Sequence, residues 1–243
     1  MTTMIRDIQA LIFDIDDTLV PTTSHWELAL DAAARRVGEL AAHADPVTVA
    51  RSYRHVSDDL WSDFVRNLAH LGANENIRRH VWAQALRSVD VDLSPIDLES
   101  VVNCFADTQR EAIQPDQTII DLLTMLGRRF QLAICTNGDG RLSHTKLERA
   151  GLSRLFRIII CGQDEGVRKP NPELFLRCCR ALDTPPRHCM HIGDDRELDV
   201  RGALNAGIQP IWISPPVAPK EPPVLAPRFS TVADCLRALT CTI

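Results

Sequence analysis

The stretch Ala10-Leu-Ile-Phe-Asp14-Ile-Asp16-Asp-Thr18 decides the fold of this 243-residue chain. Its opening apolar run, within a predicted strand at 10–15, is typical of strands that are buried on both faces of a parallel sheet. Asp14 and Asp16 lie two residues apart, so on an extended backbone they point to the same side, and one can attack while the other transfers a proton. The spacing alone is a weak signal, because acidic turns and helix caps use the same residues.

Four further apolar runs have the same character and each predicts a strand: 131–136, 157–161, 189–192 and 209–213. Helical patterns follow the spacing of apolar residues at 116–126, 142–150, 172–182 and 197–206. Gly151 and Gly207 stand just after two of them, where glycine commonly ends a helix. Strands that alternate with helices predict a doubly wound, Rossmann-like α/β fold with a parallel sheet covered on both faces.

A long insertion interrupts this alternation, because no strand-like run occurs between the first and second predicted strands. Ser24 with Glu27 forms a capping box, and the pairs Asp45-Pro46 and Ser94-Pro95 each supply an N-cap and a first-turn proline. A further amphipathic pattern covers 75–87. Four such helices predict a small α-helical bundle. The predicted domains are an α/β core of residues 1–20 and 114–243 and a helical cap of residues 21–113.

Polar residues follow three of the other predicted strands. They are Thr136-Asn137-Gly138 after the second, Lys169-Pro170 after the third and Gly193-Asp194-Asp195 after the fourth. Ligands of a doubly wound sheet bind beyond the carboxyl ends of its strands, so we expect these residues to gather around Asp14. Carboxylates suit Mg²⁺, while a lysine and a hydroxyl suit a phosphoryl group.

This set of motifs resembles the haloacid dehalogenase-like (HAD) superfamily, in its phosphatase branch. The four family motifs match Asp14 to Thr18, Thr136, Lys169, and Gly193 to Asp199, and the match spans the whole predicted sheet domain. The helical insertion resembles the type 1 cap of the family, and the stretch from Arg168 to Phe175 looks typical of this branch. The resemblance implies an enzyme that hydrolyses phosphomonoesters, with Mg²⁺ as cofactor and a small phosphorylated metabolite as substrate.

The resemblance also implies roles for single residues. Asp14 is the nucleophile and forms an aspartyl-phosphate, while Asp16 protonates the leaving alcohol and then activates water. Metal ligands are the carboxylates of Asp14 and Asp194 and the backbone carbonyl of Asp16. Thr136, Asn137 and Lys169 bind the phosphoryl oxygens, with Thr136 and Lys169 also counted as catalytic.

Two acids after the fourth predicted strand, Asp195 and Asp199, can each be interpreted in two ways. An acid at a helix N-terminus commonly caps it and complements the helix dipole, and Asp195 is read as such a cap or as an auxiliary site residue. The family pattern fits Asp199, which would orient Lys169 or a metal-bound water, or would again serve the helix alone.

Four other functions share parts of this pattern with a phosphatase. A phosphomutase of the same superfamily shares every core motif and stays open, because only the cap groups differ. A 2-haloacid dehalogenase is disfavoured, because that class lacks the acid corresponding to Asp16. A receiver domain that accepts phosphate as a signal is shorter and has no inserted bundle, and a non-catalytic binding protein does not require Asp14, Asp16 and Lys169 together.

The charge and the apolar content of the sequence limit which classes of binding partner we expect. The formal net charge is −5 and the basic residues are scattered, so we expect no nucleic-acid partner. Residues 1–8 lack the apolar core of a signal peptide, and no window of about 18 apolar residues follows. We therefore expect a cytoplasmic protein that does not associate with membranes. We expect its cysteines to be reduced. The oligomeric state, monomer or homodimer, stays open. Five residues of the predicted cap are equally candidates for substrate contacts and for bundle core: His25, Trp26, Trp61, Phe64 and Trp82.

Overall fold

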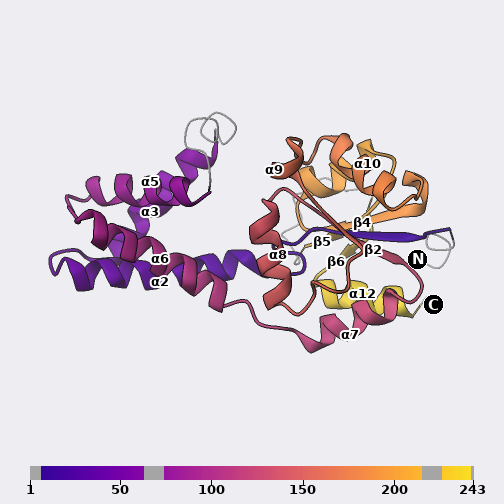
Figure 1. Ribbon diagram of the computed structural model, residues 1–243, viewed down its shortest axis with the longest axis horizontal. Helices are drawn as coiled ribbons and strands as arrows, with labels where there is room; N and C mark the ends of the chain where they lie inside the picture. Colours follow the sequence, from indigo (N-terminus) through magenta and orange to yellow (C-terminus); the bar gives the residue numbers. More distant parts are fainter. Residues whose placement is uncertain (1–6, 63–73, 215–225, 242–243) are drawn as a thin grey trace. The chain divides into compact units, whose positions relative to one another are not determined.

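The computed structural model describes residues 7–62, 74–214 and 226–241. The chain divides into two compact units. The first, here called the core unit, comprises Met1–Thr22 and Ile113–Ile243, and the second, the helical unit, comprises Thr23–Ala112. Figure 1 shows strands in the core unit and helices alone in the described part of the helical unit.

The core unit is built on a six-stranded sheet with the order β3-β2-β1-β4-β5-β6, and every neighbouring pair is parallel. The strands are β1 (Ala10–Phe13), β2 (Gln131–Thr136), β3 (Ile158–Cys161), β4 (Cys189–Gly193), β5 (Gln209–Ile213) and β6 (Arg228–Phe229). Phe13 at the end of β1 pairs with Ile134 on one side and Ile192 on the other. Asp14 therefore leaves the sheet between β2 and β4, and the predicted doubly wound α/β fold is confirmed.

Both faces of the sheet are covered, which explains why its strands are apolar without alternation. Leu11 and Phe13 belong to a core shared with α7 (Gln117–Leu126) and α12 (Val232–Thr240). Ala10 and Ile12 point to the opposite face, where α10 (Pro172–Ala181) and α11 (Gly202–Asn205) cover them. The sheet lies between these two helical layers in Figure 1.

The connections differ from the predicted pattern in three places. The predicted helix 197–206 is a π-helical segment, η2 (Arg196–Arg201), followed by the short α11. A one-turn helix, α9 (Gly162–Glu165), follows β3, and β6 pairs with β5 although it has only two residues. Such short elements carry no readable periodicity. The remaining short helices are α8 (Gly140–Arg149) and the 3₁₀ turn η1 (Pro186–His188).

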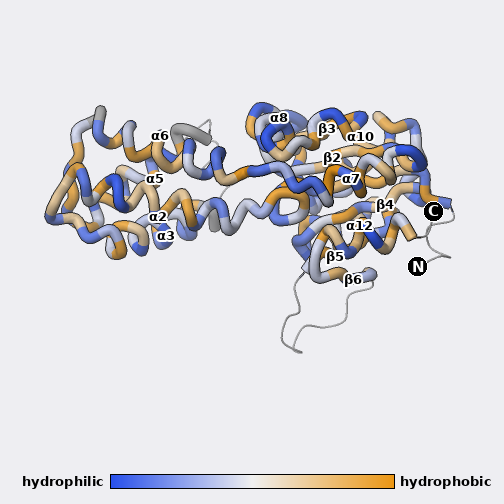
Figure 2. Tube along the Cα trace, turned by 90° about the horizontal axis from the view of Figure 1, so that it is seen from below, coloured by the Kyte–Doolittle hydropathy of each residue, from blue (hydrophilic) through white to orange (hydrophobic). Residues whose placement is uncertain are grey.

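The helical unit contains, in its described part, α2 (Thr22–Leu40) beyond its first residue, α3 (Pro46–Ser62), α5 (Asn74–Arg87) and α6 (Pro95–Glu111). Ser94 caps α6 by accepting a hydrogen bond from the Asp97 amide, as predicted. Hydrophobic and hydrophilic residues are interspersed along these helices in Figure 2, and the buried hydrophobic ones form the core of the unit. Trp82 is fully buried in the core of the unit, with Tyr53 and Phe105 against its ring.

Of the other cap candidates, Trp26 packs against this same core. Phe64 and the side chain of Trp61 lie outside the described residues. Within the described ranges, no helix has the length and apolar character needed to cross a membrane.

Candidate active site

Asp14 is buried at the carboxyl end of the central strand β1. Its backbone N–H donates to the Ile192 carbonyl at 3.0 Å, which continues the β1–β4 ladder by one residue and fixes the backbone. The residue is 5% exposed. Burial raises the pKa of Asp14 to about 7, because a desolvated carboxylate is costly; the Lys169 ammonium opposes this effect.

Lys169 joins two buried acids. Its Nζ lies 2.6 Å from Oδ1 of Asp14 and 2.6 Å from Oδ1 of Asp199. Its side chain is only 3% exposed. Burial lowers the pKa of Lys169, but the two carboxylates outweigh burial and keep the pKa above its ordinary value. Lys169 is therefore a fixed positive charge beside Asp14.

Asp199 is occupied as a hydrogen-bond acceptor on both oxygens. Oδ1 receives Lys169 and also lies 2.8 Å from His191 Nε2, while Oδ2 accepts the Asp195 amide at 3.0 Å. Burial raises its pKa, but Lys169 and His191 outweigh burial and hold the pKa below the ordinary range. The carboxyl carbon of Asp199 lies where a Cβ at position 193 would stand, at 2.3 Å, so only glycine fits at Gly193.

Asp194 is the third acid at this edge. Thr18 Oγ1 donates to its Oδ1 at 3.2 Å, and the Trp212 indole N–H donates to its backbone carbonyl at 2.7 Å. Partial burial raises the pKa of Asp194 to about 7, with Asp199 and Asp17 adding repulsion.

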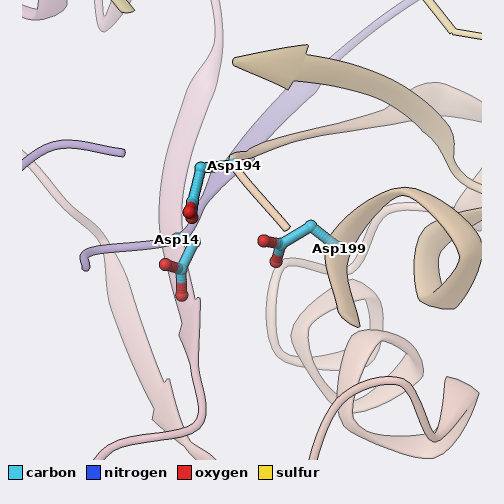
Figure 3. A group of neighbouring side chains, drawn as sticks. All are labelled: Asp14, Asp194 and Asp199. Atoms are coloured by element: carbon cyan, nitrogen blue, oxygen red, sulfur yellow. The ribbon is translucent and has the colours of Figure 1, made fainter. Parts of the chain in front are cut away.

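The chemistry of these donors fits a hard divalent cation. One carboxylate oxygen from each of Asp14, Asp194 and Asp199 lies within 4.8 Å of the others, and Figure 3 shows the Asp194 and Asp199 carboxylates directed toward Asp14. An all-oxygen set of this kind suits Mg²⁺. Asp199 already accepts three hydrogen bonds, so Asp14 and Asp194 have more oxygens to offer a metal ion. A cation between them would stabilise both carboxylates in their charged form and so oppose the effect of burial, which raises both pKa values.

The residues after β2 form a polar turn beside this group. Thr136 ends β2 and is 2% exposed, and the Gly138 amide lies 3.4 Å from its Oγ1. Asn137 pairs with the backbone of Lys169: Nδ2 donates to the Lys169 carbonyl at 3.1 Å, and Oδ1 accepts the Lys169 amide at 2.7 Å. The side chain of Asn137 therefore holds the Lys169 backbone in place.

Asp16 and Asp195 lie differently from the buried acids. Asp16 is partly exposed, and its Oδ1 accepts hydrogen bonds from Lys146 and from Thr22. Asp195 caps η2, with Oδ1 accepting the Glu197 and Leu198 amides at 2.8 Å each. The capping interpretation of Asp195 thus accounts for its side chain.

A family model of haloacid dehalogenase-like hydrolases matches residues 8–207. The chain belongs to this family. The matched residues include the predicted motifs at all four strand ends, and the family recognised from those motifs is confirmed.

Relatives of this HAD-like hydrolase include named phosphatases. The glyceraldehyde 3-phosphate phosphatase of Methanopyrus kandleri is 28% identical over 207 residues, which cover 85% of this chain and 84% of that protein. The phosphoserine phosphatase of Thermus thermophilus is 31% identical over 232 residues, covering 88% and 92%. The solved structure of the HAD-hydrolase YfnB from Bacillus subtilis, bound to magnesium, matches this chain with a TM-score of 0.72 at 23% identity. The match covers 96% of this chain and 98% of that one, and it shows that the two folds are alike.

The sequence did not predict four residues of this HAD-like site: Thr22, Lys146, His191 and Trp212. Lys146 and Asp16 are 130 positions apart, so no local spacing links them. His191 lies within an apolar run, where its buried contact with Asp199 has no sequence signal. A polar residue inside an otherwise apolar strand was the one available hint.

Proposed function

We propose that this protein is a magnesium-dependent phosphatase that hydrolyses a small phosphorylated metabolite through an aspartyl-phosphate on Asp14. The observation that carries the proposal is the contact of buried Lys169 with both Asp14 and Asp199, beside the Asp194 carboxylate. A nucleophilic carboxylate repels a phosphoryl group unless positive charge lies next to both. Lys169 supplies one such charge.

Asp14 and Asp194, with the backbone carbonyl of Asp16, would hold Mg²⁺, which supplies further neutralisation of phosphoryl charge. An oxygen of Asp14 attacks phosphorus and displaces the leaving alcohol, so hydrolysis is divided into two displacements. The Thr136 hydroxyl, the amides of the following turn and the Lys169 ammonium donate to the phosphoryl oxygens.

Asp16 is proposed as the acid and base. It would give its proton to the leaving oxygen as the Asp14–phosphorus bond forms, and would take a proton from water as that bond breaks. Its side chain is 38% exposed, so solvent water can reach it.

Substrate choice is proposed to reside in the helical unit, acting as a cap with the predicted bounds 21–113. Support comes from the relatives, whose names specify glyceraldehyde 3-phosphate and phosphoserine, both small phosphomonoesters. The described aromatic residues Trp26 and Trp82 contribute to the core of that unit, which favours its polar side chains as the specificity groups. A phosphomutase remains the alternative within the family, and the presence of Asp16 argues against a 2-haloacid dehalogenase.

The test is turnover of a phosphometabolite panel and of 4-nitrophenyl phosphate, with and without Mg²⁺. We expect release of inorganic phosphate only with the metal, and loss of that release in Asp14→Asn. A mutase would convert one phosphate ester into another without releasing phosphate. Halide release from a 2-haloacid, or phosphate release without a divalent metal, would contradict the proposal.

A further inference from the structure

The Asp16 carboxylate is held by two donors from distant parts of the core unit. Lys146 Nζ, on α8, forms an ion pair with Asp16 Oδ1. Thr22, the first residue of α2, donates to the same oxygen from its hydroxyl at 2.6 Å. Both bonds go to Oδ1, so neither engages Oδ2.

Helix α8 presents Lys146 from a fixed position. The helix begins directly after the polar turn that follows β2, and the Asp139 side chain caps it by accepting the Leu142 amide at 2.8 Å. Ser143 and Leu147 are buried on the inner side of α8, and Lys146 lies between them along the chain, with its side chain only 23% exposed. The ammonium group is therefore carried by an anchored helix.

The ion pair between Lys146 and Asp16 is expected to contribute little to the stability of the fold. Exposed and partly exposed pairs contribute about 0–1 kcal/mol, because solvent screens them and their side chains lose freedom. Orientation gives a stronger reason, since proton transfer requires the acid to lie within about 2.6–3.2 Å of the atom it serves. A carboxylate tethered through one oxygen has its other oxygen held in a limited set of directions.

We propose that Lys146 is a positioning residue that, together with Thr22, holds Asp16 by Oδ1 and thereby directs Oδ2 to the reacting oxygen. This role rests on the proposed phosphatase reaction. In the first step the Asp16 proton moves to the leaving oxygen as that oxygen separates from phosphorus and Asp14 bonds to phosphorus. In the second step a water oxygen bonds to phosphorus, Asp14 is released, and the water proton moves to Asp16.

A double-mutant cycle tests this role. Steady-state rates are measured in Mg²⁺ for the unmodified protein, Lys146→Met, Asp16→Asn and the double variant, with phenyl phosphate and 4-nitrophenyl phosphate as probes. We expect Lys146→Met to lower kcat about tenfold on phenyl phosphate and less on 4-nitrophenyl phosphate, whose leaving group needs less protonation. In the Asp16→Asn background the same change is expected to cost less than about twofold, because its effect passes through Asp16.

Two further variants separate positioning from general damage. Lys146→Arg keeps a cation in reach of Asp16 and is expected to recover most of kcat. Arg237→Met removes an exposed ion pair with Asp234 on α12, changes the net charge equally, and is expected to leave kcat and KM unchanged.

Several results would overturn the role of Lys146. An equal loss in both backgrounds, or a raised KM with unchanged kcat, would mean that Lys146 contacts the substrate directly. An unchanged kcat in Lys146→Met, with Mg²⁺-dependent turnover intact, would contradict the role of Lys146 and leave the proposed phosphatase function standing. Absence of turnover in the unmodified protein with every phosphate ester tested would remove the proposed function and this role with it.

Discussion

The Lys169 ammonium lies 2.6 Å from Oδ1 of Asp14, and both side chains are less than a tenth exposed. A lysine desolvated to this degree is stable as a cation only beside anions, and Asp14 and Asp199 provide them. In the proposed reaction, the Lys169 ammonium that these two carboxylates keep protonated lets a phosphoryl group approach Asp14. The stability of this buried pair and the proposed reaction therefore depend on the same contact.

Replacing Lys169 by methionine is expected to destabilise the fold in a pH-dependent way. Two buried carboxylates lose their cation, which costs about 3–5 kcal/mol of unfolding free energy at pH 8. Because Lys169 lowers the pKa of Asp14, which is already about 7, its removal raises that pKa further, so at pH 5.5 Asp14 takes up a proton and the cost is smaller. Denaturant unfolding at both pH values measures the difference. Equal costs at both would show that Asp14 does not bear the uncompensated charge.

Magnesium is expected to raise the melting temperature more at pH 8 than at pH 5.5. The folded-state pKa values of Asp14 and Asp194 are about 7, above their ordinary value of 3.8, so in the metal-free protein their contribution to stability is lost as the pH rises through 7. Protons compete with the metal for these oxygens, so binding strengthens over the same range. Thermal unfolding with and without Mg²⁺ at each pH isolates this effect. Asp194→Asn should abolish the pH-dependent difference, and a shift that is constant with pH would contradict the metal assignment.

His191→Leu is expected to lower kcat about tenfold with little change in KM, because Asp199 loses a donor and holds Lys169 less firmly. The Asp199 carboxylate can only accept, so His191 donates through Nε2, while burial lowers the pKa of His191. His191→Gln keeps a donor and should recover part of the loss. Steady-state kinetics, with thermal unfolding to compare stability, measures both. A full kcat in the leucine variant would show that this hydrogen bond does not affect the reaction.

Gly193→Ala is expected to reduce activity by at least tenfold, because the added methyl group would occupy the place of the Asp199 carboxyl carbon, 2.3 Å away. Asp199 must then move, and Lys169 loses one of its two anchors. Phosphate release by the folded variant checks this expectation. Unchanged activity would mean that Asp199 can be displaced without consequence.

The arrangement of the sheet and its motifs was predictable from the sequence. Parallel strands bring their carboxyl ends to one edge, so Asp14, Lys169 and Asp194 could be expected together although they lie far apart along the chain. The structure brings Asp14 and Asp194 carboxylate oxygens within 4.8 Å. Strands in which apolar residues do not alternate with polar ones predicted helices on both faces of the sheet, because this pattern is typical of sheets that are buried on both faces.

The contacts around these motifs were not predictable. Lys146 reaches Asp16 across 130 positions, and its partner depends on how α8 is seated rather than on any spacing. The π-helical geometry at Asp199 likewise depends on tertiary contacts, since its residues 196–201 read as ordinary helix. Trp26 and Trp82 could not be assigned to core or substrate from residue type alone, because aromatic side chains serve both.

The most direct test of the central claim is the mass of the peptide that contains Asp14 after acid quenching during turnover. The Asp16→Asn variant, mixed with 4-nitrophenyl phosphate and Mg²⁺, lacks the base for the second step and should accumulate the intermediate. We predict that Asp14 carries one phosphoryl group in this variant and that the group is absent without Mg²⁺. A phosphoryl group on another residue, or nitrophenol release with Asp14 unmodified at every quench time, would contradict nucleophilic catalysis by Asp14.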